Sequence, residues 1–421
     1  MTPDSPEIFL FTFALCFVFI LLVPLAIAGL ALINAGLGRS RSAAHAMTGS
    51  LCVIGISVLV YFVWGFKVQG YRFQPQFVGP LYHNPLSQPG FFFMGLNSGF
   101  ASFAALLGLF SVALACLIPL GAAADRWRLS AACASTVLLA GCTYPIFAHW
   151  AWTATLSARW SLGPAFIDAG GSGVIQVTGG LTALSLAWLL GPRRGKYSSN
   201  GMPAAIPAHN GVYVLFGCML AWVGWMGLNS AGAILYAGLP AESSVLVAIN
   251  TTFSAMTAAL TAAAMTKIRF RKPDASLIAN GWVGGLVASS AGCASLKPAT
   301  AVLTGFVAGA LVVLAIEFLE FTLKIDDPCG SVSVHAVAGL WGLLAVGIFS
   351  GELGQLLAQL VGVATLLGFV LPLTYGLNWL LGRFIQHRVS VDGERQGLDL
   401  HELGADAYPE FAVHADEFMQ R

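Results

Sequence analysis

The sequence predicts an all-α polytopic membrane protein with eleven transmembrane helices, arranged as two inverted five-helix repeats (5+5) plus one further helix. Three observations predict this fold class. Of the 421 residues, 57% are hydrophobic and only 9% are charged, whereas soluble domains carry about 25% charged residues. Long apolar segments recur along the chain, and one short sequence frame occurs twice. A lipid-facing surface explains the first two observations, and an internal repeat explains the third.

Eleven segments are apolar and long enough to cross a bilayer, which takes about 20 residues of helix. They cover residues 8–33, 46–66, 97–121, 130–150, 170–191, 210–232, 244–266, 275–296, 301–323, 330–350 and 356–382. The first is too long for a signal-peptide core and no basic segment precedes it, so we expect it to be retained. Residues 8–191 and 210–350 would form the repeats and 356–382 the extra helix, within a transmembrane domain of residues 1–383; residues 384–421 would form a tail.

The basic residues predict the orientation. Most of the 20 Lys and Arg residues lie in alternate loops and in the tail, and the positive-inside rule makes that side cytoplasmic. We therefore expect the N-terminus outside, the C-terminus inside, and a plasma-membrane location of the prokaryotic inner-membrane type. The net charge of +1 gives no reason to expect a nucleic-acid partner. The eight cysteines lack metal or redox spacing, so we predict neither a metal nor a cofactor.

The repeated frame is DAGGSGVIQ (168–176) and DPCGSVSVH (327–335). Each copy has Asp, then Gly three residues on, Ser four on and a polar residue eight on, and each continues to a Gly–Leu pair. Asp168 should lie at the outer end of the fifth helix and Asp327 at the inner end of the tenth, so the frame occurs in opposite orientations. Gln176 and His335 each lie about 12 Å further on. A pseudo-two-fold axis would bring these two side chains together near mid-membrane.

Each member of this pair has an ordinary alternative. His335 could be a packing histidine, and Gln176 could make a simple interhelical hydrogen bond. An ionisable residue inside a membrane is nevertheless a functional candidate by default, and the symmetric placement favours a pore-lining pair. A purely structural membrane scaffold would leave the pair without a purpose. An enzyme is not favoured either, because the sequence shows no nucleophile–base set or metal cluster.

Further motifs resemble the ammonium transporter, methylammonium permease and Rhesus family over nearly the whole chain. They are ADRWR (124–128), AHWAW (148–152), GWMGLN (224–229), DDPCGSVSVHAVAGLWG (326–342) and GLDLHELGADAYPEF (397–411). The resemblance implies a homotrimer in the lipid bilayer, with one narrow pore per subunit and an outer vestibule that recruits ammonium. Two facing histidines line the channel in most members. His335 matches the second of them, and Gln176 stands where the first would be.

The resemblance also assigns roles near the vestibule. Trp152 is the best recruitment residue, because an indole face attracts cations; a tryptophan of the membrane-interface belt is the alternative. Asp168 should cap the fifth helix and add negative charge to the vestibule. The vestibule serine of the family falls on Gly232, with Ser230 nearby. Trp225 resembles a tryptophan that lines the pore, with helix packing as its alternative.

The pore floor departs from the family pattern. Most members block it with two stacked phenylalanines, and those positions fall here on Leu228 and Ser111. Phe110 is adjacent to Ser111, but one residue is about 100° around a helix. In the first helix, Ile33 and Asn34 replace the family's aromatic residues. Several pore features therefore change together while the scaffold motifs remain.

Gln176 changes the expected chemistry, because an imidazole can take up a proton near neutral pH and an amide cannot. One hypothesis is a protein that binds ammonium, conducts ammonia and ammonium slowly or not at all, and works as a sensor through its tail. The alternative is a conventional ammonium transporter. The last residues, AVHADEFMQR (412–421), are either a natural end or the start of a linker to a cytoplasmic regulatory or signalling domain. An ordinary regulatory tail also fits.

Overall fold

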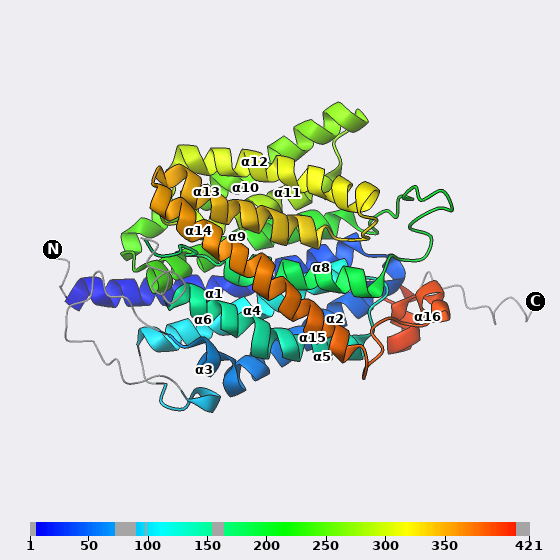
Figure 1. Ribbon diagram of the computed structural model, residues 1–421, viewed down its shortest axis with the longest axis horizontal. Helices are drawn as coiled ribbons and strands as arrows, with labels where there is room; N and C mark the ends of the chain where they lie inside the picture. Colours follow the sequence, from blue (N-terminus) through cyan, green and yellow to red (C-terminus); the bar gives the residue numbers. More distant parts are fainter. Residues whose placement is uncertain (1–5, 72–89, 97–98, 154–163, 410–421) are drawn as a thin grey trace, which may run out of the picture.

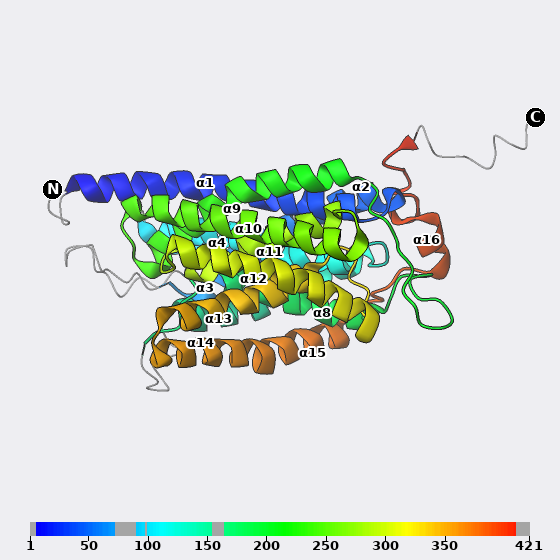
Figure 2. The same ribbon diagram turned by 90° about the horizontal axis from the view of Figure 1, so that it is seen from above.

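The computed structural model describes residues 6–71, 90–96, 99–153 and 164–409. Its helices lie side by side along the long axis of the molecule (Figure 1). Helix α1 begins at one end of the bundle, and the tail with α16 lies at the other (Figures 1 and 2). We call these the N-terminal end and the tail end. A chain that crosses the bundle an odd number of times must begin and end at opposite ends of it.

The regular elements of the described residues are all helices; these residues contain no β-strand, only two isolated bridges at Trp127–Arg388 and Tyr197–Pro203. The all-α prediction is therefore confirmed. The first half contains α1 (Pro6–Leu37), η1 (Ser40–Ser42), α2 (Ala43–Val60), η2 (Tyr61–Gly65), α3 (Phe66–Gln69), η4 (Phe91–Phe93), α4 (Phe100–Ala122), α5 (Leu129–Leu138), η5 (Leu139–Thr143), α6 (Tyr144–Trp152), η6 (Ser172–Val177) and α8 (Thr178–Leu190). The second half and the tail contain α9 (Gly211–Ala237), η7 (Ala241–Ser243), α10 (Ser244–Phe270), α11 (Ala275–Gly292), α12 (Pro298–Glu317), η8 (Phe318–Thr322), η9 (Val332–Val337), α13 (Ala338–Ser350), α14 (Leu353–Thr365), η10 (Leu366–Val370), α15 (Leu371–Leu381), α16 (Val391–Gln396) and η11 (Asp399–Leu403).

Ten helical stretches of the described chain are long and apolar enough to cross a membrane. The remaining predicted span, 275–296, forms helix α11 but is not among these ten. Its interior carries Asn280, Ser289 and Ser290, which lower its mean hydropathy, and all three side chains are buried. A helix surrounded by other helices does not need an apolar surface, because its polar groups can find partners within the protein.

Several membrane helices contain a π-helical turn. These turns are η2, η5, η6, η8, η9 and η10. A π turn inserts one extra residue and rotates the side chains that follow it, and such turns are frequent at functional sites. Gln176 lies in η6 and His335 lies in η9, so the two members of the repeated frame share this local geometry.

Small residues let the longest helices approach closely, as in the packing of α1 against α9. A Cβ added to Gly29 would lie 2.5 Å from the carbonyl oxygen of Gly217, and one added to Gly224 would lie 2.1 Å from the backbone nitrogen of Ala26. Only glycine permits backbones this close. Helix α1 runs along one edge of the bundle, while α14 and α15 run along the opposite edge (Figure 2).

The tail folds back onto the loops of the tail end. The carboxylate of Asp399 accepts hydrogen bonds from the backbone nitrogens of Ala44 (3.1 Å) and His45 (2.7 Å), at the N-terminus of α2. Glu402 accepts one from the backbone nitrogen of Leu129 (2.9 Å), at the start of α5, and also bonds the ring Nε2 of His45 (2.7 Å). The two acids thus cap two helices of the membrane bundle. The segment AVHADEFMQR (412–421) lies outside the described residues.

Candidate functional site

Gln176 and His335 meet in the interior of the bundle. His335 Nδ1 donates a hydrogen bond to Gln176 Oε1 over 2.8 Å. The side chains belong to residues that are 0% and 2% exposed, so water does not compete for this bond. A carbonyl oxygen can only accept, so the imidazole carries its proton on Nδ1 and keeps Nε2 as an acceptor.

The pair retains free hydrogen-bonding capacity. Gln176 Nε2 has no hydrogen-bond partner among the described residues, and a buried amide donor without a partner is unfavourable by about 1–3 kcal/mol. A hydrogen bond between an amide and a neutral imidazole consumes one donor and one acceptor. The pair therefore presents the two N–H donors of the Gln176 amide and one ring-nitrogen acceptor to any small guest molecule that reaches it.

The two helices that carry the pair run in opposite directions. The η6–α8 segment finishes at the tail end, where the carbonyl of Leu190 accepts a hydrogen bond from Arg388 Nη1 (2.7 Å). The η9–α13 segment starts at the tail end, after Asp326, which binds Arg193 of the α8–α9 loop. Gln176 and His335 lie where these antiparallel segments cross, which fits the inverted repeat predicted from the sequence.

Matching glycines in the repeated frame make this crossing possible. A Cβ added to Gly180 would lie 2.4 Å from the backbone nitrogen of Ala336, the residue after His335. A Cβ added to Gly339 would lie 2.6 Å from the Val177 side chain, one residue after Gln176. Each glycine follows its polar partner by four residues and allows the opposite helix to approach. The glycines of the frame thus set the distance between the amide and the imidazole.

The two acids of the frame cap the helices that carry the pair. Asp168 Oδ2 accepts from the backbone nitrogens of Gly173 and Val174, each over 2.9 Å. Asp327 accepts from those of Ser331 (2.9 Å) and Val332 (2.7 Å). This is the capping arrangement that the sequence predicts for Asp168. Both carboxylates orient the first turn of a helix whose second turn holds Gln176 or His335.

Trp152 lies at the opposite end of the bundle from the tail, beside Asp168. Its indole Nε1 donates to the carbonyl oxygen of Asp168 (2.8 Å), which fixes the plane of the ring. Tyr236 of α9 stacks on one face, with ring centroids 3.9 Å apart and planes 6° apart. Tyr71 packs edge-on against Tyr236 at 6.2 Å. No sequence motif connects Tyr71 or Tyr236 to Trp152, so these contacts could not be predicted from the sequence.

The other predicted pore residues are all buried. Trp225 donates its indole N–H to the Ser290 hydroxyl (3.0 Å), so a helix-packing contact already uses its polar group. Leu228 and Ser230, on the same helix, are each 1% exposed. Ser111 on α4 is also 1% exposed, whereas its neighbour Phe110 is only partly buried. The small hydroxyl, and not the phenyl ring, therefore points toward the interior of the bundle.

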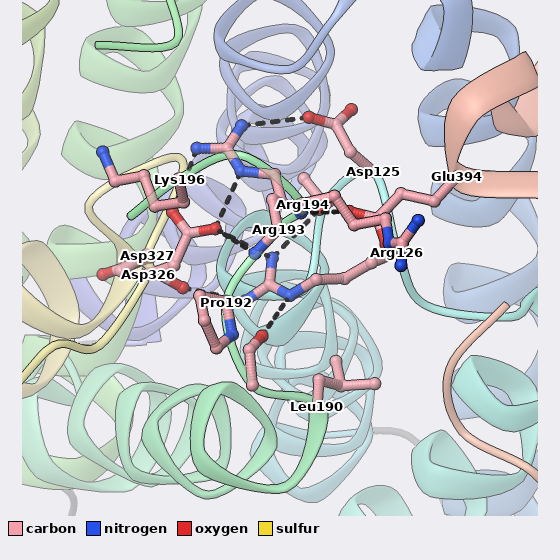
Figure 3. Close-up of polar contacts among 12 residues, drawn as sticks. Asp125, Arg126, Leu190, Pro192, Arg193, Arg194, Lys196, Asp326, Asp327 and Glu394 are labelled. Atoms are coloured by element: carbon pink, nitrogen blue, oxygen red, sulfur yellow. Dashed lines mark hydrogen bonds and ion pairs between the residues drawn. The ribbon is translucent and has the colours of Figure 1, made fainter. Parts of the chain in front are cut away.

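The tail end contains a buried network of charges (Figure 3). Asp125, Arg126 and Asp326 lie in motifs noted in the sequence, but their connection through Arg193 does not follow from those motifs. Arg193 binds Asp326 through Nε (2.9 Å) and Nη2 (3.0 Å), and Asp125 through Nη1 (3.0 Å). Arg126 donates to the carbonyl oxygens of Asp326 and Gly191, each over 2.8 Å. Burial alone would raise the pKa of Asp326, but Arg193 and Arg126 outweigh it and hold that pKa at about 2. The network ties together the loops that follow α4, α8 and η8.

A cavity of about 1090 Å³ opens beside this network. It extends past Asp326 and Asp327 to Gly330 and Ser333, two residues before His335. The Ser333 hydroxyl has no hydrogen-bond partner in the described part of the chain. The cavity therefore reaches the start of the helix that carries His335 from the tail end. Residues 6–71, 90–96, 99–153 and 164–409 contain no cluster of His, Cys, Asp and Glu that could hold a metal ion.

A multi-pass helical bundle with an amide–imidazole pair at the crossing of two antiparallel helices defines a membrane protein of the channel and transporter class. The chain belongs to the Ammonium Transporter Family, whose model matches residues 14–408. Proteins of this family are transporters and channels, not enzymes.

Individual relatives extend over most of the chain. It is 32% identical over 416 residues to ammonium transporter Amt2 of Archaeoglobus fulgidus, covering 93% of this chain and 86% of the relative. The protein called Amt2 in Haloferax mediterranei is 31% identical, covering 91% and 87%. A solved structure named Sensor Amt Protein has a TM-score of 0.80 and 28% identity, covering 92% of this chain and 97% of that one. Mep2 of Candida albicans, at a TM-score of 0.78 and 21% identity over 94% and 90%, shows the same fold.

Proposed function

We propose that this protein binds ammonium beside Trp152 and at the Gln176–His335 pair, passes it slowly or not at all, and acts as an ammonium sensor. The proposal rests on one observation. Proton exchange would need a titratable side chain at both pore positions, and one of them, position 176, holds an amide. Family membership supports the ligand. We further propose that the chain works as a homotrimer in the membrane, as the sequence resemblance implies.

The hydrogen-bonding capacity of the pair favours ammonia over ammonium. A cation at the centre of a bilayer is unfavourable by several kcal/mol, whereas ammonia is neutral and small. Ammonia offers three N–H donors and one acceptor, which match the ring-nitrogen acceptor and the amide donor of the pair. Ammonium has donors only, and the amide N–H would oppose it. Passage therefore requires the proton to leave.

The amide limits what happens to that proton. An imidazole can take up a proton at one nitrogen and release another, so two imidazoles in contact can relay it. Gln176 has no such second state, because a carboxamide does not titrate in the physiological range. His335 alone can hold the proton, and its partner cannot pass it on. Slow turnover with retained binding follows from this difference.

Recruitment would use the surroundings of Trp152. An indole face attracts a cation by about 0.5–2 kcal/mol, and Tyr236 covers one face of this ring, so a cation would meet the other. Burial raises the pKa of Asp168 to about 7, so the side chain is only partly ionised at neutral pH. Its partial negative charge adds to the attraction without direct contact, since the carboxylate caps the following helix. Ser230, buried on α9, is a further candidate for this vestibule.

The tail supplies a route from the bundle to a signal. Asp399 and Glu402 hold the N-termini of α2 and α5 directly, so a shift of either helix would change how the tail is docked. A regulatory or signalling domain connected through the tail could respond to that change. The solved protein named Sensor Amt Protein, which this chain resembles at a TM-score of 0.80, favours the same reading.

A conventional ammonium transporter is the second candidate. It is favoured by the Amt2 relatives, which are named ammonium transporters at 32% and 31% identity. Under this reading, Gln176 changes the rate or selectivity of conduction but does not prevent it.

Parallel measurements on one preparation distinguish the sensor from the conventional transporter. The protein is reconstituted into liposomes, ammonium-dependent current is recorded, and ammonium binding is measured on the same protein by calorimetry. The proposal expects binding with little or no current. Robust current with ammonium selectivity would replace the sensor by the transporter, and loss of both signals would remove ammonium as the ligand.

A further inference from the structure

A second polar site lies at the tail end, away from the Gln176–His335 pair. A cleft of about 510 Å³ is lined by Arg39, Arg41, Arg194, Gly195, Glu394 and Arg395. From this cleft we infer that the protein binds a phosphate-bearing anion between its tail and its membrane bundle. The inference does not depend on whether the chain conducts ammonium.

The four arginines come from separate segments of the chain. Arg39 and Arg41 lie in the short connection between α1 and α2, Arg194 lies in the α8–α9 loop, and Arg395 lies in α16 of the tail. Like charges repel unless an anion between them compensates. The fold nevertheless holds them in place with backbone contacts, one of which is the hydrogen bond from Arg41 Nη1 to the Arg395 carbonyl oxygen (2.7 Å).

The acids nearby are already occupied. Glu394 accepts from the backbone nitrogen of Arg194 (2.6 Å) and from Arg388 Nη2 (2.7 Å). Asp125 is 3.8 Å from Arg39 Nε, but it bonds Arg193 more closely, at 3.0 Å. The cleft therefore keeps a surplus of positive charge.

Two guanidinium groups have no partner. In the described chain no hydrogen bond or ion pair is made by the side chains of Arg194 and Arg395, and both residues are exposed. Burial, followed by the charges of Arg193 and Arg41, lowers the pKa of Arg39 against the opposing effect of Asp125.

Arginine and phosphate fit each other in shape and charge. A guanidinium group presents parallel N–H donors that match two phosphate oxygens, and the resulting bonds are stronger than those between neutral groups. A carboxylate ligand would offer fewer acceptor oxygens to the four arginines that line the cleft. Since the cleft is bounded by both the tail and the loops of the bundle, a bound phosphate would connect them and stabilise the docked tail.

The phosphate could belong to a soluble compound or to an anionic lipid headgroup, and an experiment with two arms separates these sources. The first arm titrates inorganic pyrophosphate into the purified full-length protein in detergent at low ionic strength. The second compares thermal unfolding in nanodiscs of phosphatidylcholine with and without phosphatidylglycerol. Both arms use the wild type, the variant Arg194→Gln/Arg395→Gln, and the control Arg271→Gln/Lys272→Gln, which removes the same charge from exposed residues outside the cleft.

A soluble ligand predicts pyrophosphate binding that weakens about tenfold or more in the cleft variant and less than about twofold in the control. A lipid headgroup predicts no pyrophosphate binding, but a thermal stabilisation by phosphatidylglycerol that the cleft variant loses and the control keeps. The cleft variant should retain wild-type ammonium binding, which shows that it is folded. The inference is overturned if neither probe acts on the wild type, or if the cleft variant responds like the control in both arms.

Discussion

At the scale of single residues, the polar groups that already make hydrogen bonds within the protein are distinguished from those that could bind a ligand. The Trp152 indole N–H is held by the Asp168 carbonyl oxygen and that of Trp225 by the Ser290 hydroxyl. The groups that we propose meet the ligand are the face of Trp152 opposite Tyr236, the amide nitrogen of Gln176 and the Nε2 of His335. These groups differ in chemistry, because the indole face favours a cation and the pair favours a neutral guest.

Substitution of Trp152 tests the recruitment step. We expect Trp152→Leu to weaken ammonium binding about 2- to 30-fold, because the lost cation–π attraction is about 0.5–2 kcal/mol. Calorimetric titration of ammonium measures the change. Trp150→Leu is the control, because Trp150 lies in the same helix but packs against Phe369, with centroids 4.8 Å apart. Equal affinities for both variants would assign Trp152 to packing.

Part of this site could be predicted from the sequence. The repeated frame identified Gln176 and His335 as neighbours, and they are bonded over 2.8 Å, because an inverted repeat relates two positions by symmetry alone. The partners that fix them could not be predicted in this way. Tyr236 lies over Trp152 and Ser290 holds Trp225 through contacts between segments far apart in the sequence, and no local pattern encodes such a contact.

At the scale of elements, close helix packing controls the distance between the two halves. The sequence predicted where the helices lie, because apolar length is a strong signal. It did not predict the π-helical turns η6 and η9, since their extra residue depends on hydrogen bonds that form only after packing. Helix α11 shows the limit of the hydropathy signal: its buried Asn280 is compatible with a helix enclosed by others.

Gly180 provides a test of this packing. We expect Gly180→Ala to lower the free energy of unfolding by about 1–3 kcal/mol. The new Cβ would lie 2.4 Å from the backbone nitrogen of Ala336, which cannot move aside. The pair would separate, and ammonium binding should fall as well. Thermal unfolding in detergent and calorimetry measure the two effects.

Gly376→Ala is the matched control for that experiment. Gly376 lies inside α15 and an added Cβ would meet no atom within 4 Å. Alanine is preferred over glycine in a helix by about 0.5–1 kcal/mol, so this variant should be as stable as the wild type or more so. If both variants behaved alike, the close approach at Gly180 would not hold the halves together.

At the scale of the whole molecule, the tail end is built from polar contacts between segments that are distant in sequence. Arg193 holds Asp125 and Asp326, and the tail caps α2 and α5. Only 9% of the residues in the chain are charged, and several of them lie at the tail end. The tail is therefore joined to the bundle by direct hydrogen bonds, and the proposed sensing role depends on these contacts.

The docking of the tail should depend on pH through Glu402. Burial alone would raise the pKa of Glu402, but the hydrogen bonds from His45 and the Leu129 backbone lower it overall. A folded-state pKa below the ordinary value of about 4.3 means that the stabilisation is complete above that value. It is lost as the pH falls through the lower, folded-state pKa. We expect tail docking to persist at neutral pH and to weaken only when the pH falls below the ordinary pKa of a glutamate side chain.

A substitution isolates this contact at neutral pH. Glu402→Gln should speed tryptic cleavage after Arg395 about fivefold, because a lost charged cap is worth about 1 kcal/mol. Glu352→Gln is the control, since Glu352 precedes α14 and its side chain makes no cap hydrogen bond. Cleavage at wild-type rates in the Glu402 variant would show that this carboxylate does not hold the tail.

The central claim is that the amide at position 176 interrupts proton transfer, and the ammonium current of Gln176→His in liposomes tests it most directly. The account predicts a current at least about 100-fold above the wild type, the lower end of the range of 10²–10⁴ that positioned proton-transfer groups contribute, with ammonium affinity changed little. Gln176→Leu, which removes the hydrogen bond to His335, should conduct no better than the wild type. A Gln176→His current equal to that of the wild type, with binding intact, would contradict the account.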